Sequence, residues 1–379
     1  MRKKIIFNGL TFDEANVIPI ALKINNFQKF GCDITIFGNE NLEKKINVTG
    51  ILQNYRLLKF SRKIQTRGKI NFLFESIFRN ILAIKYIRKV RGKYDVIYSF
   101  SVLDSILFPF ILKIFDKKIK WVAVFDNVVP LSDPGNKIIR FLAWIFFKIS
   151  LKLLKRADRI FVISDDLEKF MLQKGFKREK IILSTNGVEN DLIKKAEVDE
   201  KYNIDALFLG RINETKGIYD MLEVLNIVRG KYPDFQLVIM GEGDETTKHQ
   251  FKRRIKNMDL ENNVQFLGFR TGQEKFNIIK SAKCFWFLSV SGSESFGVAL
   301  LEAVCSGIPA FAYDLPQFSR IYQNGEIDIS PKSDYKLVAQ KVIKLFENGN
   351  FSNERGKMFL DKYSWEHVAE IEYNAIRSL

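Results

Sequence analysis

Two glutamates, Glu294 and Glu302, flank the start of a predicted helix, and residues of this type at this spacing suit a bound ligand. The apolar run from Cys284 to Val290 is typical of a buried strand, and the segment from Gly297 to Val304 is typical of a helix. A short polar loop, 291–295, joins them. Because the first amides of a helix lack partners and the helix dipole is positive there, this strand–loop–helix unit favours a phosphate.

The two carboxylates and the helix start together fit an extended, phosphorylated ligand. A helical rise of about 1.5 Å per residue separates Glu294 from Glu302 by roughly 8 Å along the helix axis. The amides of Phe296, Gly297 and Val298 could hold a diphosphate. Glu302 could accept hydrogen bonds from a pair of ribose hydroxyls, and Glu294 from a sugar hydroxyl. In the simpler alternative, Glu294 only favours the helix dipole and Glu302 is a solvated helix residue.

A second strand–loop–helix unit, from Leu207 to Leu222, carries Arg211 and Lys216 in its loop. An Arg side chain binds two phosphate oxygens as a fork, and a Lys beside a helix start adds a point charge. This pair suits a diphosphate leaving group that gains charge as a glycosidic bond breaks. Taken alone, two solvated loop cations are the simpler interpretation.

The length and composition predict a globular protein of two domains. A chain of 379 residues suits two domains of about 150 to 200 residues each, and 46% of its residues are hydrophobic. The cysteines, Cys32, Cys284 and Cys305, are scattered and lack metal spacing, which indicates a reducing cytosol. The apolar run at the start is too short for a signal peptide, and no stretch reaches the ~18 apolar residues of a membrane span. We therefore expect a cytoplasmic protein that is soluble or peripheral.

The net charge of +16 is concentrated in the first half of the chain. Residues 1–187 contain 35 Lys and Arg against 16 Asp and Glu, whereas residues 188–379 contain 25 against 28. This asymmetry indicates an acidic partner for the first half: an anionic membrane surface, a phosphorylated lipid acceptor or nucleic acid. Nucleic acid is the weakest of the three, because no recognisable binding module accompanies the charge.

Predicted strands and helices alternate along the chain, which indicates doubly wound parallel sheets. A polar segment, 190–203, interrupts the alternation and is the best candidate for an interdomain linker. The pattern predicts two Rossmann-like α/β domains facing a cleft, and the segment 41–68 is the hardest to assign. Strands are expected at 3–8, 32–38, 94–101, 121–125, 159–164 and 180–187, and then at 206–210, 235–241, 263–269, 284–290, 308–313 and 326–330.

The whole stretch from Cys284 to Tyr313 resembles the signature of the retaining glycosyltransferase family 4, of GT-B fold, in which two glutamates separated by seven residues clasp a nucleotide sugar. Here these are Glu294 and Glu302, and FGVALLEA matches closely. The resemblance implies an N-terminal acceptor-binding domain (1–187), a C-terminal nucleotide-sugar-binding domain (188–362) and a final helix (363–379) that crosses back onto the first domain.

The resemblance also implies roles for single residues. Glu294 would bind the donor sugar, Glu302 the ribose, and the loop cations Arg211 and Lys216 the diphosphate. The amides of Phe296, Gly297 and Val298 fall at the helix start. Gly241 and Gly243, which alone indicate only a tight turn, would line the donor pocket. Phe269 and Arg270 would border the base, although an edge aromatic and a surface Arg explain them equally well.

The first half departs from the family pattern. Of the paired glycines that commonly follow the first strand, only Gly9 is retained, and Phe125 stands where a histidine is expected. Asp126 comes next; it either orients an acceptor hydroxyl or starts a turn. These departures motivate an alternative function, a catalytically degenerate GT-B homologue that binds nucleotide sugar as a membrane-associated partner subunit.

Signatures of other chemistries are absent from the sequence. There is no GxGxxG after the first strand, no Walker lysine loop, no HExxH and no nucleophile elbow. His249 and His367 are the only histidines, and no cluster of metal ligands is visible. We expect no metal and no cofactor, with the nucleotide diphosphate sugar as donor substrate.

Two basic stretches could place the first half on an anionic membrane. The run from Arg56 to Lys93 holds twelve cations against Glu75 alone. In the predicted helix from about Asn136 to Arg156, cations recur at steps of three and four or their sums beside a dense apolar face. An ordinary core helix with a solvated basic face is an equally good interpretation. The family resemblance implies a hexosyltransferase-type enzyme. The basic first half favours a location on the inner face of the cell membrane as a peripheral protein, with a lipid-linked or cell-surface glycan precursor as acceptor.

Overall fold

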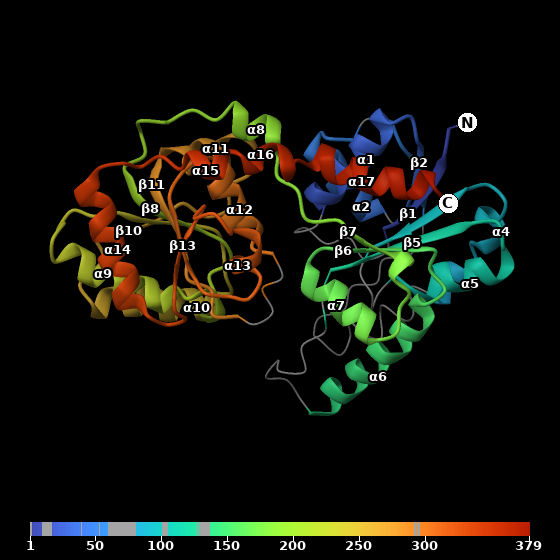
Figure 1. Ribbon diagram of the computed structural model, residues 1–379, viewed down its shortest axis with the longest axis horizontal. Coiled ribbons are helices and arrows are strands. Elements are labelled where there is room, and N and C mark those ends of the chain that lie inside the picture. The colour runs from blue at the N-terminus through green and yellow to red at the C-terminus, as the bar shows by residue number, and fades with distance from the viewer. Residues whose placement is uncertain are drawn as a thin grey trace. The chain divides into compact units, whose positions relative to one another are not determined.

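The computed structural model describes residues 2–9, 17–38, 40–52, 54–59, 81–100, 105–126, 128, 137–291, 294 and 296–379. The chain divides into two compact units, which Figure 1 shows as ribbons. The N-terminal unit comprises Met1–Gly187 together with Trp365–Leu379, and the C-terminal unit comprises Val188–Ser364.

Within its described residues, the N-terminal unit contains a seven-stranded sheet in the order β3-β2-β1-β4-β5-β6-β7. All neighbouring strands are parallel; Ile6, for example, lies opposite Thr35 on one side and Ile97 on the other. The central strands are apolar on both faces because helices cover both. The strands are β1 Lys4–Asn8, β2 Asp33–Gly38, β3 Arg56–Lys59, β4 Val96–Ser99, β5 Lys120–Phe125, β6 Arg159–Val162 and β7 Ile181–Leu183.

The helices of this unit lie on the two faces of the sheet. In Figure 1, α1 and α17 lie on one face, and α5, α6 and α7 lie on the other. The helix α7 begins where the Ser164 side chain accepts a hydrogen bond from the Leu167 amide. The helices are α1 Val17–Lys29, α2 Glu40–Thr49, α4 Ile87–Val90, α5 Leu107–Phe115, α6 Lys137–Leu154, α7 Asp165–Gln173 and α17 Trp365–Arg377, with a 3₁₀ turn at Arg178–Lys180.

The C-terminal unit repeats this architecture, with six parallel strands in the part that the structure describes, in the order β10-β9-β8-β11-β12-β13. One face is covered by α9, α10 and α14, and the other by α8, α11 and α12 (Figure 1). The strands are β8 Ile204–Leu209, β9 Leu237–Met240, β10 Val264–Phe266, β11 Ala282–Phe287, β12 Ala310–Tyr313 and β13 Asp328–Ser330. The helices are α8 Asn190–Lys194, α9 Ile218–Arg229, α10 Glu245–Asn257, α11 Gly272–Ser281, α12 Val298–Cys305, α13 Phe318–Ile321, α14 Tyr335–Asn348, α15 Glu354–Lys357 and α16 Phe359–Lys362.

The C-terminal helix α17 packs on α1, as expected for the GT-B fold, and a buried polar cluster fixes it there. The fully buried carboxylate of Glu372 accepts hydrogen bonds from Lys23 Nζ at 2.7 Å, Tyr98 Oη at 2.5 Å and Ser184 Oγ at 2.6 Å. Burial and the charge of Glu372 raise the pKa of Tyr98, so this phenol stays protonated and donates. Lys23 lies on α1, Tyr98 on β4 and Ser184 directly after β7, so contacts with three parts of the N-terminal unit fix the position of the helix.

The structure differs from the sequence-based expectations in two places. The segment 41–68 contains most of α2 and the edge strand β3, neither of which was predicted. The proposed linker, 190–203, begins with α8, whose Ile193 is buried against the C-terminal unit, so the segment is part of that unit. Part of the basic run, 60–80, lies outside the described residues. No helix among the described residues combines the length and the apolarity that a membrane crossing requires.

Candidate functional site

The strand order of the C-terminal unit places a candidate site at its carboxyl edge. The order reverses between the adjacent strands β8 and β11, so the connections that follow them leave toward opposite sides of the sheet. Open parallel sheets bind ligands at such a switch point. The loop after β8 carries Arg211 and Lys216, and the loop after β11 carries Glu294. Four of the predicted residues, including Glu302 on α12, therefore come from the two connections that meet there.

Backbone contacts hold the two loops against each other. The carbonyl of Thr215 accepts hydrogen bonds from the Val290 amide at 3.0 Å and from Ser289 Oγ at 3.1 Å. Gly217 follows directly, with a φ of 73°, and a Cβ atom there would lie 1.9 Å from the carbonyl oxygen of Leu288. Glycine is required at this position because it alone permits both the left-handed conformation and the close approach.

Lys216 and Glu294 form an ion pair across the two loops. Their side chains are 25% and 13% exposed, so the pair lies at the border between protein and solvent. The ammonium of Lys216 lies 5.4 Å from the ring centroid of Phe287, and the side-chain amide of Gln317 donates to the Glu294 carbonyl. Thus the structure brings together a predicted phosphate-binding cation and a predicted sugar-binding carboxylate.

The start of α12 presents backbone amides to the same edge. Its N-cap residue is Gly297, with a φ of 71°, which has no side chain with which to cap the helix. Phe296 is 2% exposed and packs edge-on against Tyr363, so its backbone, not its ring, is relevant to the prediction. Val298 is the first helical residue. An uncapped helix start favours an anion through its unpaired amides and its dipole.

Glu302 is not the solvated helix residue of the simpler alternative, because it is buried and paired. Its carboxylate accepts a hydrogen bond from Lys275 Nζ at 2.8 Å, and Lys275 also lies 3.3 Å from Glu189. All three side chains are less than 15% exposed. Burial by itself lowers the pKa of Lys275, but Glu302 and Glu189 outweigh it and the pKa is raised. Burial raises the pKa of Glu189, and the charge of Glu302 adds to this, while Lys275 opposes it.

Arg211 remains available for a ligand. Its side chain is exposed, and within the described part of the chain no carboxylate lies in ion-pair distance of it. The loop that carries it is fixed, because the Gly210 amide donates to Met240 at 3.0 Å and the Ile212 amide donates to Glu242 at 2.9 Å.

Gly241 and Gly243 have a packing role in the structure. A Cβ atom on Gly241 would lie 1.9 Å from the Gly210 carbonyl oxygen, and one on Gly243 would lie 2.5 Å from the Ile212 carbonyl oxygen. The two glycines therefore permit the loop after β9 to approach the loop that carries Arg211. Their predicted contact with a donor stays a prediction.

Phe269 and Arg270, the predicted neighbours of the base, lie after β10. Phe269 is 68% exposed, which is unusual for a large aromatic side chain and is consistent with a ligand contact. The guanidinium of Arg270 lies 3.2 Å from Glu274 on the next turn and donates to the Phe269 carbonyl at 3.1 Å. The contact of Phe269 and Arg270 with a base stays a prediction.

Gly9 and Asp126 belong to the N-terminal unit. Each directly follows a strand, β1 and β5 respectively, so both lie at the carboxyl edge of that sheet, and the Gly9 amide donates to the Phe37 carbonyl at 2.9 Å. Asp126 is exposed. Phe125, at the position where the family carries histidine, is fully buried and stacks on Phe170 at 5.8 Å, so its ring serves the core.

Two residues of the candidate site, Glu189 and Lys275, were not predicted. They lie 86 residues apart in the sequence, and neither is part of a motif. Only the tertiary fold, which packs α11 beside α8 and lets Lys275 reach Glu302 of α12, brings them together. Among the described residues no group of three or more His, Cys, Asp or Glu side chains is arranged to hold a metal ion.

Comparison with known proteins identifies the C-terminal unit. Residues 189–358 match the family described as Glycosyl transferases group 1. The phosphatidyl-myo-inositol mannosyltransferase of Mycobacterium leprae is 32% identical over 193 residues, which cover 48% of this chain and 50% of the relative. The GDP-mannose:cellobiosyl-diphosphopolyprenol alpha-mannosyltransferase of Xanthomonas oryzae is 26% identical over 167 residues, or 43% of each chain. The aligned regions thus span half or less of these relatives.

The fold is shared over the whole chain. HepE from Anabaena, solved in complex with UDP, superposes with a TM-score of 0.77 at 13% identity and covers 100% of both chains. Identity at this level establishes the fold alone. The segment 189–358 thus matches the Glycosyl transferases group 1 family, and the chain as a whole shares the GT-B fold.

Proposed function

We propose that this protein is a retaining hexosyltransferase that moves a sugar from a nucleotide diphosphate sugar to an acceptor held by the N-terminal unit. One observation carries the proposal: the Lys216–Glu294 ion pair, the uncapped start of α12 and the buried, charge-paired Glu302 all occur on the two connections at one switch point. These groups are chemically suited to bind the diphosphate, the sugar and the ribose of the donor.

The residues have separate tasks in this proposal. Arg211 and Lys216 offset the charge that develops on the leaving diphosphate, and the amides at Phe296, Gly297 and Val298 contribute to the same end. Glu294 accepts from a hydroxyl of the donor sugar. Glu302, held by Lys275, accepts from the ribose hydroxyls; a carboxylate fixed in advance binds them without an ordering cost.

The reaction would proceed on one face of the sugar. The bond from the anomeric carbon to the diphosphate oxygen breaks, and a bond from the same carbon to the acceptor oxygen forms. The acceptor proton passes to the leaving diphosphate, so configuration is retained. Asp126, exposed at the carboxyl edge of the N-terminal sheet, is available to orient the acceptor hydroxyl.

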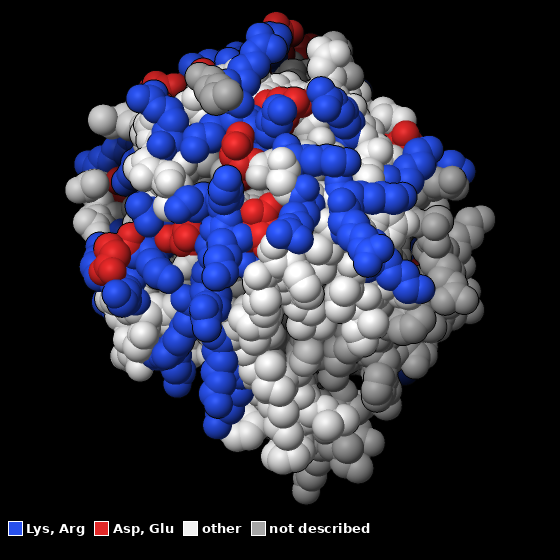
Figure 2. Space-filling model, turned by 90° about the vertical axis from the view of Figure 1, so that its right-hand side faces the viewer, with Lys and Arg blue, Asp and Glu red and all other residues white. Residues whose placement is uncertain are grey.

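A lipid-linked or cell-surface glycan precursor is the proposed acceptor, and the inner face of the cell membrane is the proposed location. The two mannosyltransferase relatives are named for lipid acceptors, phosphatidyl-myo-inositol and a diphosphopolyprenol. The excess of cations in residues 1–187 supports the same class, because a phosphorylated lipid in a membrane is anionic. Figure 2 shows this side of the molecule, where Figure 1 labels α4 and α5; Lys and Arg outnumber the Asp and Glu that lie among them over the upper and left parts of the view.

Calorimetric binding of UDP-, GDP- and ADP-sugars tests the donor site. One class should bind the native protein, and Glu302→Ala and Lys216→Ala should each weaken it about tenfold or more, since each removes a charge-assisted contact. Glu261→Ala and Lys256→Ala, on the exposed surface of the same unit, serve as matched controls. Undiminished binding in both site variants would refute the assignment.

Slow release of free sugar from the bound donor distinguishes the enzyme from a degenerate, donor-binding partner subunit. The enzyme should hydrolyse its donor slowly in the absence of acceptor, and Glu294→Gln should abolish this release. A protein that binds the donor tightly but never releases sugar, with or without an acceptor, would be the degenerate homologue.

A further inference from the structure

A groove of about 540 Å³ lies between α6 and α7 in the N-terminal unit, and its floor is apolar. Phe147 and Leu151 of α6 contribute to the floor and are each 7% exposed. Phe170 of α7 closes it from the other side, with its ring centroid 6.3 Å from that of Phe147. This aromatic and aliphatic surface suits hydrocarbon and offers no hydrogen bond to a small polar ligand.

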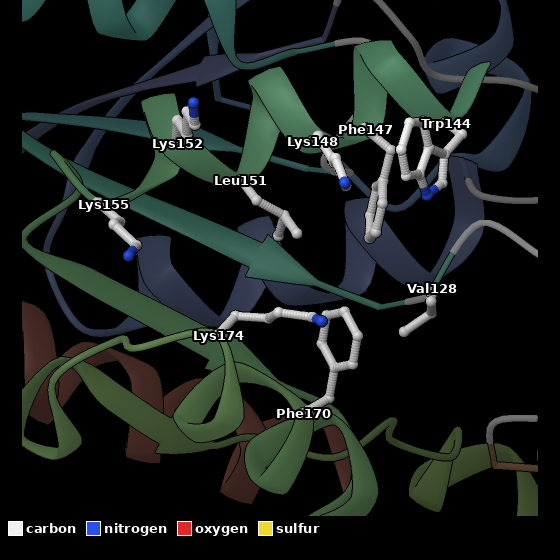
Figure 3. Close-up of a pocket in the computed structure, with 9 residues that line it drawn as sticks. All are labelled: Val128, Trp144, Phe147, Lys148, Leu151, Lys152, Lys155, Phe170 and Lys174. Carbon is white, nitrogen blue, oxygen red and sulfur yellow. The ribbon is translucent and has the colours of Figure 1, made fainter. Parts of the chain in front are cut away.

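Lysines surround this apolar floor. Lys148 and Lys152 project from α6, one helical turn apart, Lys155 directly follows the end of α6, and Lys174 follows the end of α7. In Figure 3 the side chains of Lys148, Lys155 and Lys174 extend toward the space between the helices. Two of the ammonium groups lie over rings of the groove, that of Lys148 3.7 Å from the centroid of Trp144 and that of Lys174 5.2 Å from the centroid of Phe170.

Among the described residues these four lysines have no acidic counterpart. The sequence from Lys137 to Ala157 contains neither Asp nor Glu. Within the described ranges, no carboxylate lies in ion-pair distance of any of the four side chains, all of which are exposed. Like charges gathered on one rim repel one another, so the groove is electrostatically complementary to an anion.

The outer side of α6 exposes large apolar residues beside the lysines. Phe141 is 59% exposed, Leu142 43% and Ile149 47%, and Ile149 directly follows Lys148. A helix with exposed apolar side chains next to a row of lysines is typical of one that lies in the interface of a membrane. In that setting, the apolar side chains enter the acyl region and the ammonium groups meet the headgroups.

We propose that the groove between α6 and α7 binds the phosphate of an anionic membrane lipid, with the hydrocarbon next to the phosphate on the floor of Phe147, Leu151 and Phe170. The lysines of the rim bind the phosphate, and α6 lies in the plane of the interface. The proposal deepens the membrane association proposed above and rests on it. The lipid site can be refuted without refuting the proposed donor site, because every residue of the lipid site lies in the N-terminal unit.

A lipid phosphate fits better than a free anion for a physical reason. A small anion would keep its hydration on an open groove of exposed lysines, where each contact contributes little. A phosphorylated lipid adds burial of methylene groups against the floor, worth about fourfold per buried CH₂. Only a molecule with both a phosphate and a hydrocarbon chain contacts the lysine rim and the apolar floor at once.

Tryptophan fluorescence with a monomeric lipid gives the first test. Trp144 lines the groove and is half-buried, whereas Trp121, Trp286 and Trp365 are buried. Dioctanoyl phosphatidic acid, added as a monomer, should shift the emission to the blue in a saturable manner, and Trp144→Phe should remove the change. Inorganic phosphate at the same concentration should neither reproduce the shift nor compete. Competition by phosphate, or an equal response to dioctanoyl phosphatidylcholine, would overturn the proposal.

Cosedimentation with vesicles of phosphatidylglycerol in phosphatidylcholine gives the second test. Lys155→Ala/Lys174→Ala should lower the partition coefficient about 30-fold, since each lysine at an anionic surface contributes about fivefold. Lys29→Ala/Lys44→Ala removes the same charge from exposed positions on α1 and α2 of the same unit and should change partitioning less than about twofold. If both double variants lose the same amount of vesicle binding, the binding depends only on diffuse charge and the proposed groove site is wrong. The proposal is also wrong if single-stranded RNA displaces the protein from the vesicles. Unchanged donor-sugar binding in all variants separates this result from a failure of the proposed function.

Discussion

Replacing Lys275 by methionine tests whether buried charge holds the candidate ribose-binding carboxylate in place. The change keeps most of the side-chain volume and its contact with the Phe276 ring, which lies 4.1 Å from the ammonium, and it removes only the charge. Glu302 at 2.8 Å and Glu189 at 3.3 Å then lose their shared cation. Two carboxylates are left facing each other in a site that little water reaches.

The expected cost follows from the burial of the three groups. Removing one partner of a buried ion pair typically destabilises a protein by about 3–5 kcal/mol. Because each side chain is still 11–14% exposed, we expect the lower end, about 3 kcal/mol. For a unit of this size, about 1 kcal/mol shifts Tm by about 2–4 °C, so the transition of the C-terminal unit should fall by about 6–12 °C.

The loss of stability caused by Lys275→Met should depend on pH, and the pKa of Glu189 gives the direction. In the native protein burial raises the pKa of Glu189, and the loss of Lys275, which opposes this, raises it further. A carboxyl with a folded-state pKa above its unfolded value binds more protons when folded, so stability falls as pH rises through the raised pKa. The Tm of the variant should therefore lie furthest below that of the native protein at pH 8. The difference in Tm should shrink as pH falls toward about 4.3, the ordinary pKa of Glu.

Calorimetry at several pH values decides the matter. Lys256→Met, an exposed lysine on α10, is the control and should shift Tm by less than about 2 °C. The double variant Lys275→Met/Glu302→Gln should be more stable than Lys275→Met alone, because it removes one of the unpaired charges. A Tm for Lys275→Met within about 2 °C of native at pH 8, or a deficit that grows on acidification, would refute the reasoning.

Three further predictions concern buried residues and a loop glycine that support the two units. Glu372→Leu leaves the buried Lys23 without its counter-ion and should destabilise the protein by about 3–5 kcal/mol, measured as a lower urea midpoint, whereas Glu370→Leu on the exposed side of α17 should have little effect. Gly217→Ala should cost about 3 kcal/mol or more through strain and overlap, with weaker donor binding, since the loop of Lys216 must move; an unchanged Tm would contradict this. All three cysteines are buried, and burial raises the pKa of Cys32 to about 11, so a thiol reagent at pH 8 should label none of them until the protein unfolds.

Much of the architecture could be predicted because its causes are local. Continuous apolar runs of strand length between helical periods indicate parallel strands covered on both faces, and the predicted strands at 121–125 and 284–290 correspond to β5 and β11. The helix start at Gly297 follows from its neighbours in sequence. The edge strand β3 escaped prediction because only its two central residues are even half-buried, which leaves little pattern to recognise.

Most of the strands and helices, and the motif residues at their ends, can be predicted from the amino-acid sequence, because hydrophobic periodicity, turn residues and the family signature all act over short separations. Which charges pair depends on the three-dimensional packing. Lys275 pairs with Glu302, 27 residues away, and with Glu189, 86 residues away, and Lys23 pairs with Glu372, 349 residues away. Such pairs depend on how helices pack in three dimensions, and a single sequence with 60 cations and 44 carboxylates offers no local rule for choosing among them.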